Sequence, residues 1–210
     1  MITTTKFVPS ANSLALYKKR YRDGGETVED VWKRVAGGFN EFYDLMAEGL
    51  FLPNSPALFN MGLGNGCTSS ACFVFDVDDE MGPLPTDNHR SIVNTRAKAI
   101  AVAKAGGGVG YYGGNLRARN SPIKTVHRRA CGPVGVLKDY HQISHLITQG
   151  GKRELAQMWA QPVWHPDILE IIHAKDEDPQ GMGSFNISTS WTNEEFLSAI
   201  NRTDERLASI

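Results

Sequence analysis

Residues 51–79 read FLPNSPALFNMGLGNGCTSSACFVFDVDD, and the change of character inside this stretch is the strongest indication of the fold. Small side chains at positions 68–71 lead into Cys72, and the apolar run from Phe73 to Val77 that follows is typical of a strand. A cysteine with small neighbours at the entrance of a strand can be approached closely by a substrate. A lone cysteine is also commonly a buried structural thiol. The residues alone leave both interpretations of Cys72 open.

A glycine-rich segment, KAGGGVGYYGGNLRARNSPI, occupies residues 104–123. Its glycines at 108, 110 and 113 match G-x-G-x-x-G, but a dinucleotide site needs a preceding strand, a following helix and an acidic residue about twenty positions on. Here the pattern predicts a preceding helix and a following polar stretch, and the region around Pro133 offers no acid. We therefore predict a turn whose glycines let backbone amides approach an anion or let two elements pack closely.

Basic residues follow these glycines, among them Arg117, Arg119 and Lys124. They could form a solvated basic loop, or they could bind phosphate, for which arginine is suited because its planar fork pairs with two oxygens at once. A second basic pair, Lys152 and Arg153, follows two further glycines. Two Gly/Arg loops in one small domain favour nucleotide phosphates as the ligand.

Composition limits the classes of function. The chain has 210 residues, 41% of them hydrophobic and 21% charged, which is ordinary for a globular protein of one domain or of one domain and part of another. A net charge of −1 gives no overall attraction to nucleic acid or to membranes, so neither is expected as a partner. The sequence shows no membrane-spanning stretch and no signal-peptide pattern, which predicts a cytoplasmic protein. Three cysteines are too few and too scattered for a disulfide scaffold.

The periodicity divides the chain into a mostly helical first part and an α/β second part. Thr27 and Asp30 form a near capping box for a helical stripe that runs to about Glu48, with a kink expected at Gly37-Gly38. Later segments predict helices and strands in alternation, which indicates an α/β domain. The helices are expected over residues 88–104 and 133–148, and the strands over 158–163 and 184–190.

His141 and His145 lie four residues apart on a predicted helix, a near miss to the zinc-protease motif H-E-x-x-H. The position of the general base holds Gln142, which cannot act as a base, and no third ligand is apparent. We expect these histidines to face solvent or to be satisfied in the core, and we predict no metal site.

Seven segments in order carry a family resemblance: NSPALFNMG, SSACFVFDVDD, KAGGGVGYYGGNLRARNSPI, ACGP, QGGKR, WHPDI and FNIS. Over about residues 10–200 they resemble the N-terminal part of the large, catalytic subunit of ribonucleotide reductase. RYRDGGETVEDVWKRVA and FNIS are most similar to the adenosylcobalamin-dependent branch, whereas LRARNSPI is closer to the branch that uses a separate radical-generating subunit.

The resemblance implies a helical N-terminal domain over residues 1–80, followed over residues 81–210 by the first part of a ten-stranded α/β barrel. It also implies reduction of ribonucleoside di- or triphosphates to deoxyribonucleotides by radical chemistry. The cofactor would be adenosylcobalamin, bound mainly by polypeptide outside this chain. The alternative is no cofactor in this chain and a radical supplied by a separate metal-containing subunit.

Other members place the radical cysteine and a second reducing cysteine in later motifs. The resemblance therefore implies that a C-terminal polypeptide completes the barrel and that the 210-residue chain alone is inactive. A non-catalytic remnant that keeps nucleotide binding or dimerisation is the alternative function.

On the substrate side, the resemblance makes Cys72 one of two thiols that close to a disulfide and supply two electrons, with thioredoxin or glutaredoxin restoring them. Ser55, Ala71 and Gly108 match positions that hold the phosphates or ribose of the ribonucleotide. Arg153 matches the substrate-facing arginine of a loop over residues 149–157 that communicates between effector and substrate.

On the effector side, Asp79 matches the acid that binds the ribose of a deoxynucleoside triphosphate or ATP effector. Lys104, Arg117 and Lys124 match the other polar contacts of that effector. The family also implies a homodimer.

Overall fold

The computed structural model describes residues 6–82, 89–124, 126–147 and 155–190, together with 194, 197, 198 and 200–202. The chain divides into two compact units. The first comprises Met1–Phe73, Ala99–Gly108 and Leu146–Leu155, and the second comprises Val74–Lys98, Val109–His145 and Ala156–Ile210.

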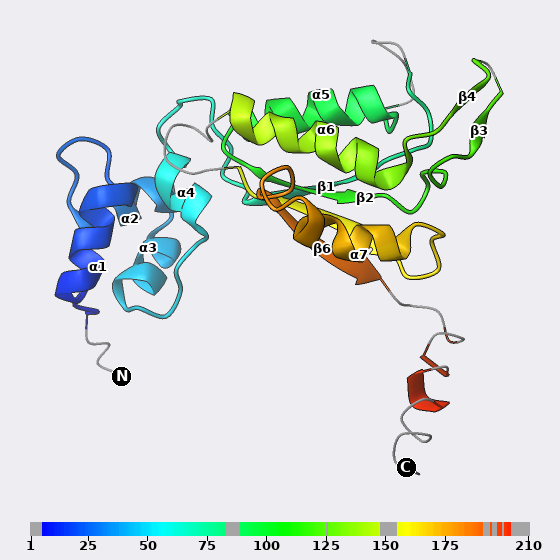
Figure 1. Ribbon diagram of the computed structural model, residues 1–210. Coiled ribbons are helices and arrows are strands. Elements are labelled where there is room, and N and C mark those ends of the chain that lie inside the picture. Colours follow the sequence, from blue (N-terminus) through cyan, green and yellow to red (C-terminus); the bar gives the residue numbers. More distant parts are fainter. Residues whose placement is uncertain are drawn as a thin grey trace. The chain divides into compact units, whose positions relative to one another are not determined.

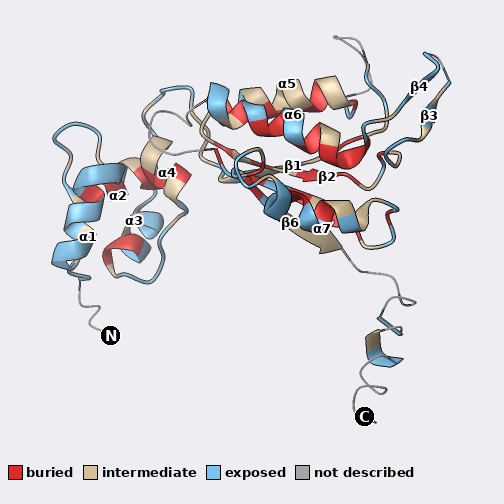
Figure 2. Cartoon of the chain, in the orientation of Figure 1, coloured by how far each residue is buried: buried red, intermediate tan, exposed pale blue. Residues whose placement is uncertain are grey.

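The first unit contains a group of short helices around one small core. They are α1 (Ala11–Leu16), the π-helical turn η1 (Tyr17–Tyr21), α2 (Val28–Ala36), α3 (Asn40–Ala47) and α4 (Ser55–Asn60) (Figure 1). Tyr17 and Trp32 lie in the core with ring centroids 6.5 Å apart, and the Trp32 indole donates a hydrogen bond of 3.0 Å to the Tyr17 hydroxyl. Figure 2 shows how the buried residues of α2 lie on one side of the helix.

The start of α2 confirms the capping prediction, and its end corrects the predicted kink. Thr27 accepts from the Asp30 backbone while the Asp30 carboxylate accepts from the Thr27 backbone, a complete capping box. Gly37 has φ 60° and Gly38 φ 90°, both left-handed, so the right-handed helix cannot continue through them. Two separate helices, α2 and α3, therefore replace the single kinked helix.

Arg34 joins α2 to the rest of the helical unit. Its Nε donates to Glu26 Oε1 at 2.7 Å and its Nη2 to Glu26 Oε2 at 3.0 Å, a two-pronged ion pair. Nη1 also donates to the Met61 carbonyl at 2.6 Å, and Nη2 contacts the carbonyls of Tyr21 and Leu58 at 3.3 Å each. The Arg34 side chain is only 10% exposed, so these partners replace most of its water. The guanidinium also lowers the pKa of Glu26 below its usual value of 4.5.

We predict that Arg34→Met lowers the free energy of unfolding by about 2–4 kcal/mol, because the half-buried Glu26 carboxylate and three carbonyls lose their partner. Lys33→Met on the exposed side of the same helix is the control and should change it little. Since the folded pKa of Glu26 is lowered, the contribution of the pair is present above pH 4.5 and is lost as the pH falls through the folded pKa. Urea unfolding at neutral and acidic pH measures both effects; equal stability of the two variants contradicts the role of Arg34.

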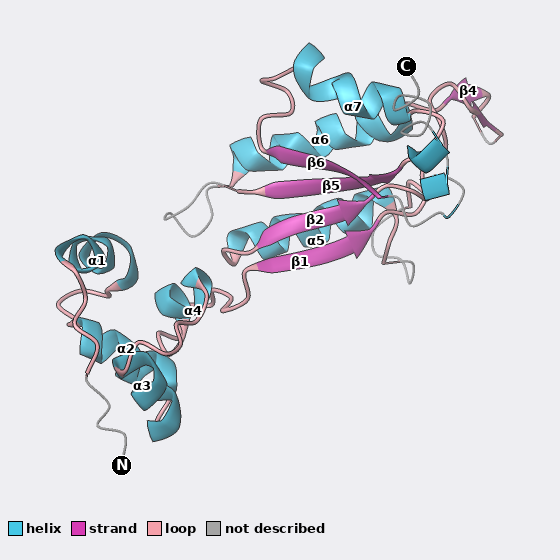
Figure 3. Cartoon of the chain, turned by 90° about the horizontal axis from the view of Figure 1, so that it is seen from below, coloured by secondary structure: helices cyan, strands magenta, loops and turns pink. Residues whose placement is uncertain are grey.

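The α/β part is built on a four-stranded sheet in the order β1-β2-β5-β6 (Figure 3). Its strands and helices alternate along the chain, as follows: β1 (Cys72–Asp76), α5 (Ile92–Lys104), β2 (Gly108–Tyr112), α6 (Gly132–Leu146), β5 (Gln157–Pro162), α7 (Ile168–Glu177) and β6 (Phe185–Ser190). A small antiparallel pair, β3 (Pro122–Ile123) and β4 (Arg128–Arg129), stands apart from the sheet.

The sheet is parallel. β5 runs parallel to β2, with Gln157 opposite Val109, and parallel to β6, with Gln157 opposite Phe185. α5 and α6 lie side by side along one face of the sheet (Figures 1 and 3). None of the helices in the described part of the chain is long and apolar enough to cross a membrane.

The predicted α/β alternation is confirmed, and one segment differs. The expected strands at Cys72, at residue 158 and at residue 184 are β1, β5 and β6, each within one or two residues of the prediction. The glycine-rich segment predicted as a turn instead contains strand β2. Val109 and Tyr111 of β2 are buried at 2% and 1% exposure, alternating with residues that are less buried, which is the pattern of a strand.

The core of the second unit is aromatic and contains the buried amide of Gln157. The ring of Tyr111 lies 4.8 Å from that of Tyr140 and 5.9 Å from that of Phe185, measured between centroids. The Tyr111 hydroxyl donates to Gln157 Oε1 at 2.8 Å. Gln157 Nε2 donates to the Tyr140 carbonyl and to Ser184 Oγ, both at 3.1 Å. Gln157, which lies on β5, therefore connects this strand to β2, to α6 and to the segment before β6.

We predict that Gln157→Met lowers the free energy of unfolding by about 2–4 kcal/mol. The methionine fills a similar volume, but it leaves the Tyr111 hydroxyl and the Tyr140 carbonyl buried without this partner. Gln142→Met, at an exposed position of α6, is the matched control and should be nearly neutral. Thermal unfolding followed by near-ultraviolet circular dichroism reports on the aromatic cluster directly, and an unchanged midpoint for Gln157→Met rules out this account.

Candidate functional site

The loop in front of Cys72 is held at three points within the first unit. The Thr68 backbone N–H donates to the Ala105 carbonyl at 2.8 Å, and Asn60 Nδ2 donates to the Thr68 carbonyl at the same distance. The Gly108 N–H donates to the Ala71 carbonyl, also at 2.8 Å. Cys72 follows as the first residue of β1, and its thiol is free and exposed. The chain thus presents this thiol next to a backbone that is fixed by hydrogen bonds.

Close packing explains why a glycine precedes β2. A Cβ atom on Gly107 would lie 2.8 Å from the Phe73 ring and 2.7 Å from a Val102 methyl group, so only glycine fits between them. Phe73 is the neighbour of Cys72. The glycine segment was predicted either to let backbone amides approach an anion or to let two elements pack closely. At Gly107 the structure shows close packing.

The other predicted substrate residues have different surroundings. Ser55 begins α4, which Asn54 caps by accepting from the Ala57 N–H, and the Ser55 hydroxyl lies 3.1 Å from that of Tyr21. Ala71 and Gly108 are joined directly by their backbone hydrogen bond. Arg153 lies outside the described residues, so the structure does not locate it.

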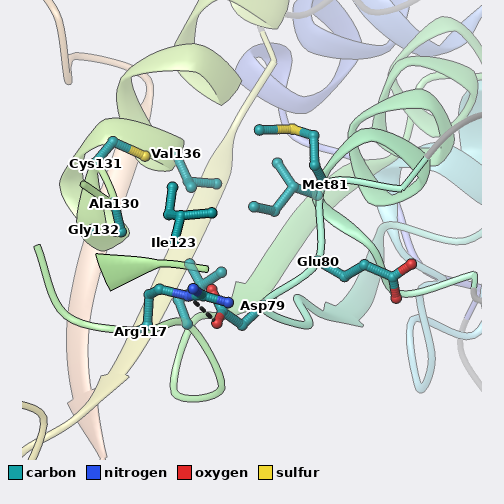
Figure 4. Close-up of a pocket in the computed structure, with 11 residues that line it drawn as sticks. Asp79, Glu80, Met81, Arg117, Ile123, Ala130, Cys131, Gly132 and Val136 are labelled. Carbon is teal, nitrogen blue, oxygen red and sulfur yellow. Dashed lines mark hydrogen bonds and ion pairs between the residues drawn. The ribbon is translucent and has the colours of Figure 1, made fainter. Parts of the chain in front are cut away.

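A pocket of about 300 Å³ lies within the second unit and contains two of the predicted effector residues (Figure 4). Asp79 and Arg117 face each other at its rim, where Arg117 Nε donates to Asp79 Oδ2 in an ion pair. Arg117 Nη1 also donates to the Pro122 carbonyl at 3.2 Å. The remaining wall is mostly apolar, from Met81, Ile92, Leu116, Ile123, Ala130, Cys131 and Val136. A pocket with one apolar wall and one charged pair suits a ligand that has a flat apolar part and polar groups.

Two further predicted effector residues do not line this pocket. Lys124 is exposed and directly follows the lining residue Ile123, and Lys104 is exposed at the end of α5. Arg119, a candidate for phosphate binding on spacing alone, instead forms an ion pair of 2.9 Å with Glu170. Of the basic residues after the glycines, the structure therefore brings Arg117 alone to the pocket wall.

Cys131, to which no role was assigned from the sequence, lines the same pocket with an exposed free thiol. It stands in the ACGP turn, where Gly132 has φ 72° and begins α6. The turn itself was part of the family resemblance, and it was the available signal that this segment lies near a site.

His141 is buried and His145 exposed, and both have hydrogen-bond partners. His141 Nδ1 lies 2.7 Å from Ser184 Oγ, and the Nε2 atoms of the two rings are 3.1 Å apart. Burial lowers the pKa of His141, and the neighbouring His145 lowers it further. The prediction of satisfied histidines is confirmed for this pair.

Comparison with known proteins agrees with this arrangement. A family model described as the barrel domain of ribonucleotide reductase matches residues 70–208. The chain belongs to the ribonucleotide reductase family. The all-alpha domain of ribonucleotide reductase matches residues 7–66, which contain α1 to α4.

Similar proteins include vitamin B12-dependent ribonucleotide reductases. A vitamin B12-dependent ribonucleoside-diphosphate reductase of Mycobacterium tuberculosis (strain CDC 1551 / Oshkosh) is 36% identical over 152 residues, covering 72% of this chain and 20% of the relative. That of Thermoplasma acidophilum is 35% identical over 157 residues, covering 75% of this chain and 19% of the relative. The chain thus spans about a fifth of these ribonucleotide reductases.

The fold is also found in a solved ribonucleotide reductase. The alpha subunit of the class Id enzyme of Actinobacillus ureae superposes with a TM-score of 0.74 at 23% identity, covering 92% of this chain and 35% of that chain. A helical part followed by a parallel α/β part is therefore the architecture of this family, and the expected fold class is confirmed.

Proposed function

We propose that this chain provides the first part of the catalytic subunit of a ribonucleotide reductase, an oxidoreductase that converts ribonucleotides to deoxyribonucleotides. Cys72 carries the proposal. Its thiol is free, exposed and positioned at the start of β1, beside the backbone hydrogen bond between Gly108 and Ala71. The exposed thiol is accessible to the second thiol that the proposal places in polypeptide outside this chain.

The role of Cys72 follows from electron counting. Replacing a ribose hydroxyl by hydrogen and releasing water consumes two electrons and two protons. Two thiols that close to a disulfide release the same number, and a thiol–disulfide exchange with thioredoxin or glutaredoxin restores them. We assign Cys72 to one of these thiols and the second thiol to polypeptide outside these 210 residues, together with the cysteine that carries the radical.

We further propose that the backbone at Ala71 and Gly108, the hydroxyl of Ser55 and the side chain of Arg153 hold the ribonucleotide. The Ala71 amide and the Ser55 hydroxyl are neutral hydrogen-bonding groups for phosphate or ribose oxygens, whereas the Gly108 N–H is held by the Ala71 carbonyl and fixes the backbone there. Arg153 supplies the positive charge. The division into a helical domain over residues 1–80 and the first part of a barrel over residues 81–210 belongs to the same proposal.

The radical source that we favour is adenosylcobalamin, which generates a radical when bound. Support comes from the relatives at 35–36% identity, whose names are vitamin B12-dependent reductases. We place most of its binding site in polypeptide beyond this chain. The described residues of the chain contribute the reducing thiol and the nucleotide contacts.

Asp79 and Arg117 form the core of the proposed effector site. We propose that a deoxynucleoside triphosphate or ATP binds here, with a ribose hydroxyl donating to Asp79 and the phosphates accepting from Arg117 and from Lys124, which follows the lining residue Ile123. Lys104 stays a predicted effector contact. In the structure the acid and the base pair with each other, so each is already oriented into the pocket. A cytoplasmic homodimer is the assembly we expect.

Reconstitution tests the function. The chain is combined with the polypeptide that follows it in related reductases, and ribonucleotide reduction is assayed with and without adenosylcobalamin. Turnover by the 210-residue chain alone contradicts the proposal, because it lacks the radical cysteine. Nucleotide binding without turnover in the complete assembly favours a non-catalytic binding remnant instead.

We predict that Cys72→Ser leaves substrate binding nearly intact in the reconstituted enzyme, because serine is similar in size. Multiple turnover should fall to background, since a serine hydroxyl cannot form the disulfide. A structural cysteine predicts the opposite, a loss of stability with turnover retained. Thermal unfolding and turnover, measured on the same sample, separate the two roles.

Cys67→Ser is the matched control for Cys72→Ser. Cys67 lies five residues earlier, is half-buried, and its backbone N–H donates to Asn65 Oδ1 at 3.0 Å without involving the thiol. Turnover should persist in this variant. Equal loss of turnover in both variants removes the special role of Cys72.

We predict that Arg117→Ala weakens effector binding by about 1.5–3 kcal/mol, the range for a hydrogen bond to a charged group. Arg119→Ala is the control, because Arg119 lies two residues away and pairs with Glu170 instead. Calorimetric titration of the reconstituted enzyme with a deoxynucleoside triphosphate measures both. Unchanged affinity in Arg117→Ala excludes Arg117 from the effector site, whatever the outcome for Cys72.

A further inference from the structure

The proposed reductase function leaves one cluster of side chains unused. His141 and His145 lie one turn apart near the end of α6, with their Nε2 atoms 3.1 Å apart. Their rings are nearly perpendicular, at 87°, and the ring centroids are 4.8 Å apart. Imidazole nitrogen is a common ligand for zinc, copper and nickel ions.

The spacing of the two nitrogens matches a chelate. Bonds of about 2.05 Å from one ion to two nitrogens that are 3.1 Å apart enclose an angle of about 100°. This angle lies between about 90° for square-planar and about 109° for tetrahedral coordination.

The ring positions support the same arrangement. The centre of each ring lies about 1.2 Å behind its Nε2 atom. If both rings point at one ion, the two ring centres are expected about 4.9 Å apart. A head-to-head hydrogen bond along the line of the two nitrogens would place the centres about 5.5 Å apart. The observed 4.8 Å therefore fits rings that converge on a common point.

A second shell of hydrogen bonds orients His141. Its Nδ1 lies 2.7 Å from Ser184 Oγ, which accepts from Gln157 Nε2 at 3.1 Å, and the Ser184 backbone N–H reaches the same Nδ1 at 3.5 Å. Gln157 is fixed in turn, because its Oε1 accepts from the buried Tyr111 hydroxyl. A ligand histidine typically donates its other ring N–H to such a partner, which turns the Nε2 lone pair toward the metal.

We propose that His141 and His145 form a two-histidine site for a divalent transition-metal ion such as Ni²⁺, Zn²⁺ or Cu²⁺. The ion takes the place of the proton that one Nε2 donates to the other. This proton moves to Nδ1 of the ring that carried it. Within the residues that the structure describes, no third histidine, cysteine, aspartate or glutamate completes a larger group, so water takes the other positions.

The site is open on one side and anchored on the other. His145 is exposed, so an ion reaches it from solvent, whereas His141 is buried and held in place. A bound ion links two side chains across one turn of α6 and thereby stabilises this end of the helix.

Calorimetric titration with NiCl₂ at pH 7.5 tests the site, using the 210-residue chain without an affinity tag. The three cysteines are first alkylated with iodoacetamide, so that thiols do not contribute to binding. Loss of an outer hydrogen-bonding partner typically weakens a metal site about 10- to 100-fold, and loss of a ligand should cost at least as much. We therefore expect one ion per chain, bound at least about tenfold more weakly by His145→Ala.

His173→Ala is the control, because His173 is an exposed histidine on a different helix, α7. It should bind Ni²⁺ like the unaltered chain. His145→Gln, which keeps a polar side chain at this helical position, should behave like His145→Ala. Saturating Ni²⁺ should also raise the thermal midpoint of the unaltered chain and not that of either His145 variant.

Electron paramagnetic resonance with Cu²⁺ adds an independent measurement. Coupling to two imidazole nitrogens, reduced to one or none in His145→Ala, supports the chelate. Equal affinity of the His145→Ala and unaltered chains overturns the proposal, and so does equal weakening by His173→Ala. Neither result bears on Cys72, so the proposed reductase function stands or falls separately.

Discussion

The buried amide of Gln157 is the constraint on which the α/β unit depends. A fully buried amide that lacks partners is costly, so the chain must bring a hydroxyl, a carbonyl and a second hydroxyl to it at once. Those groups come from β2, from α6 and from the segment before β6. A shift in strand register would separate them, and for this reason the buried Gln157 helps to specify the alignment of the strands.

Local signals in the sequence were sufficient for elements that local chemistry determines. The capping box at Thr27 and the apolar run after Cys72 each depend on neighbours within a few residues, and both were predicted correctly. Strand β2 was not, because glycines interrupt its alternation and the strand forms by pairing with β1 and with β5, which is nearly fifty residues away. The break at Gly37 was mistaken for a kink because the sequence does not display the sign of φ.

The site residues, like the elements of the fold, were predictable only where local sequence determines them. Asp79 and Arg117 are 38 residues apart, and no spacing rule joins them, so family resemblance was the only source for that pair before the structure placed them in contact. Cys131 escaped notice because its position in the pocket wall depends on how the turn before α6 folds back. The histidine pair was recognised from its spacing, but the convergence of its nitrogens depends on rotamers that only the packing of Ser184 against His141 determines.

The ion pair between Asp79 and Arg117 also bears on selectivity. An acid and a base that neutralise each other contribute little net field to the pocket, and the Glu80 carboxylate also lines it, so a simple anion gains little by approaching. A ligand that separates the guanidinium from the carboxylate leaves both charges without a partner, unless the ligand brings a donor for Asp79 and an acceptor for Arg117. A ligand that offers a hydrogen-bond donor to Asp79 and an anionic acceptor to Arg117 satisfies both charges, whereas a ligand that binds only one of them leaves the other without its partner.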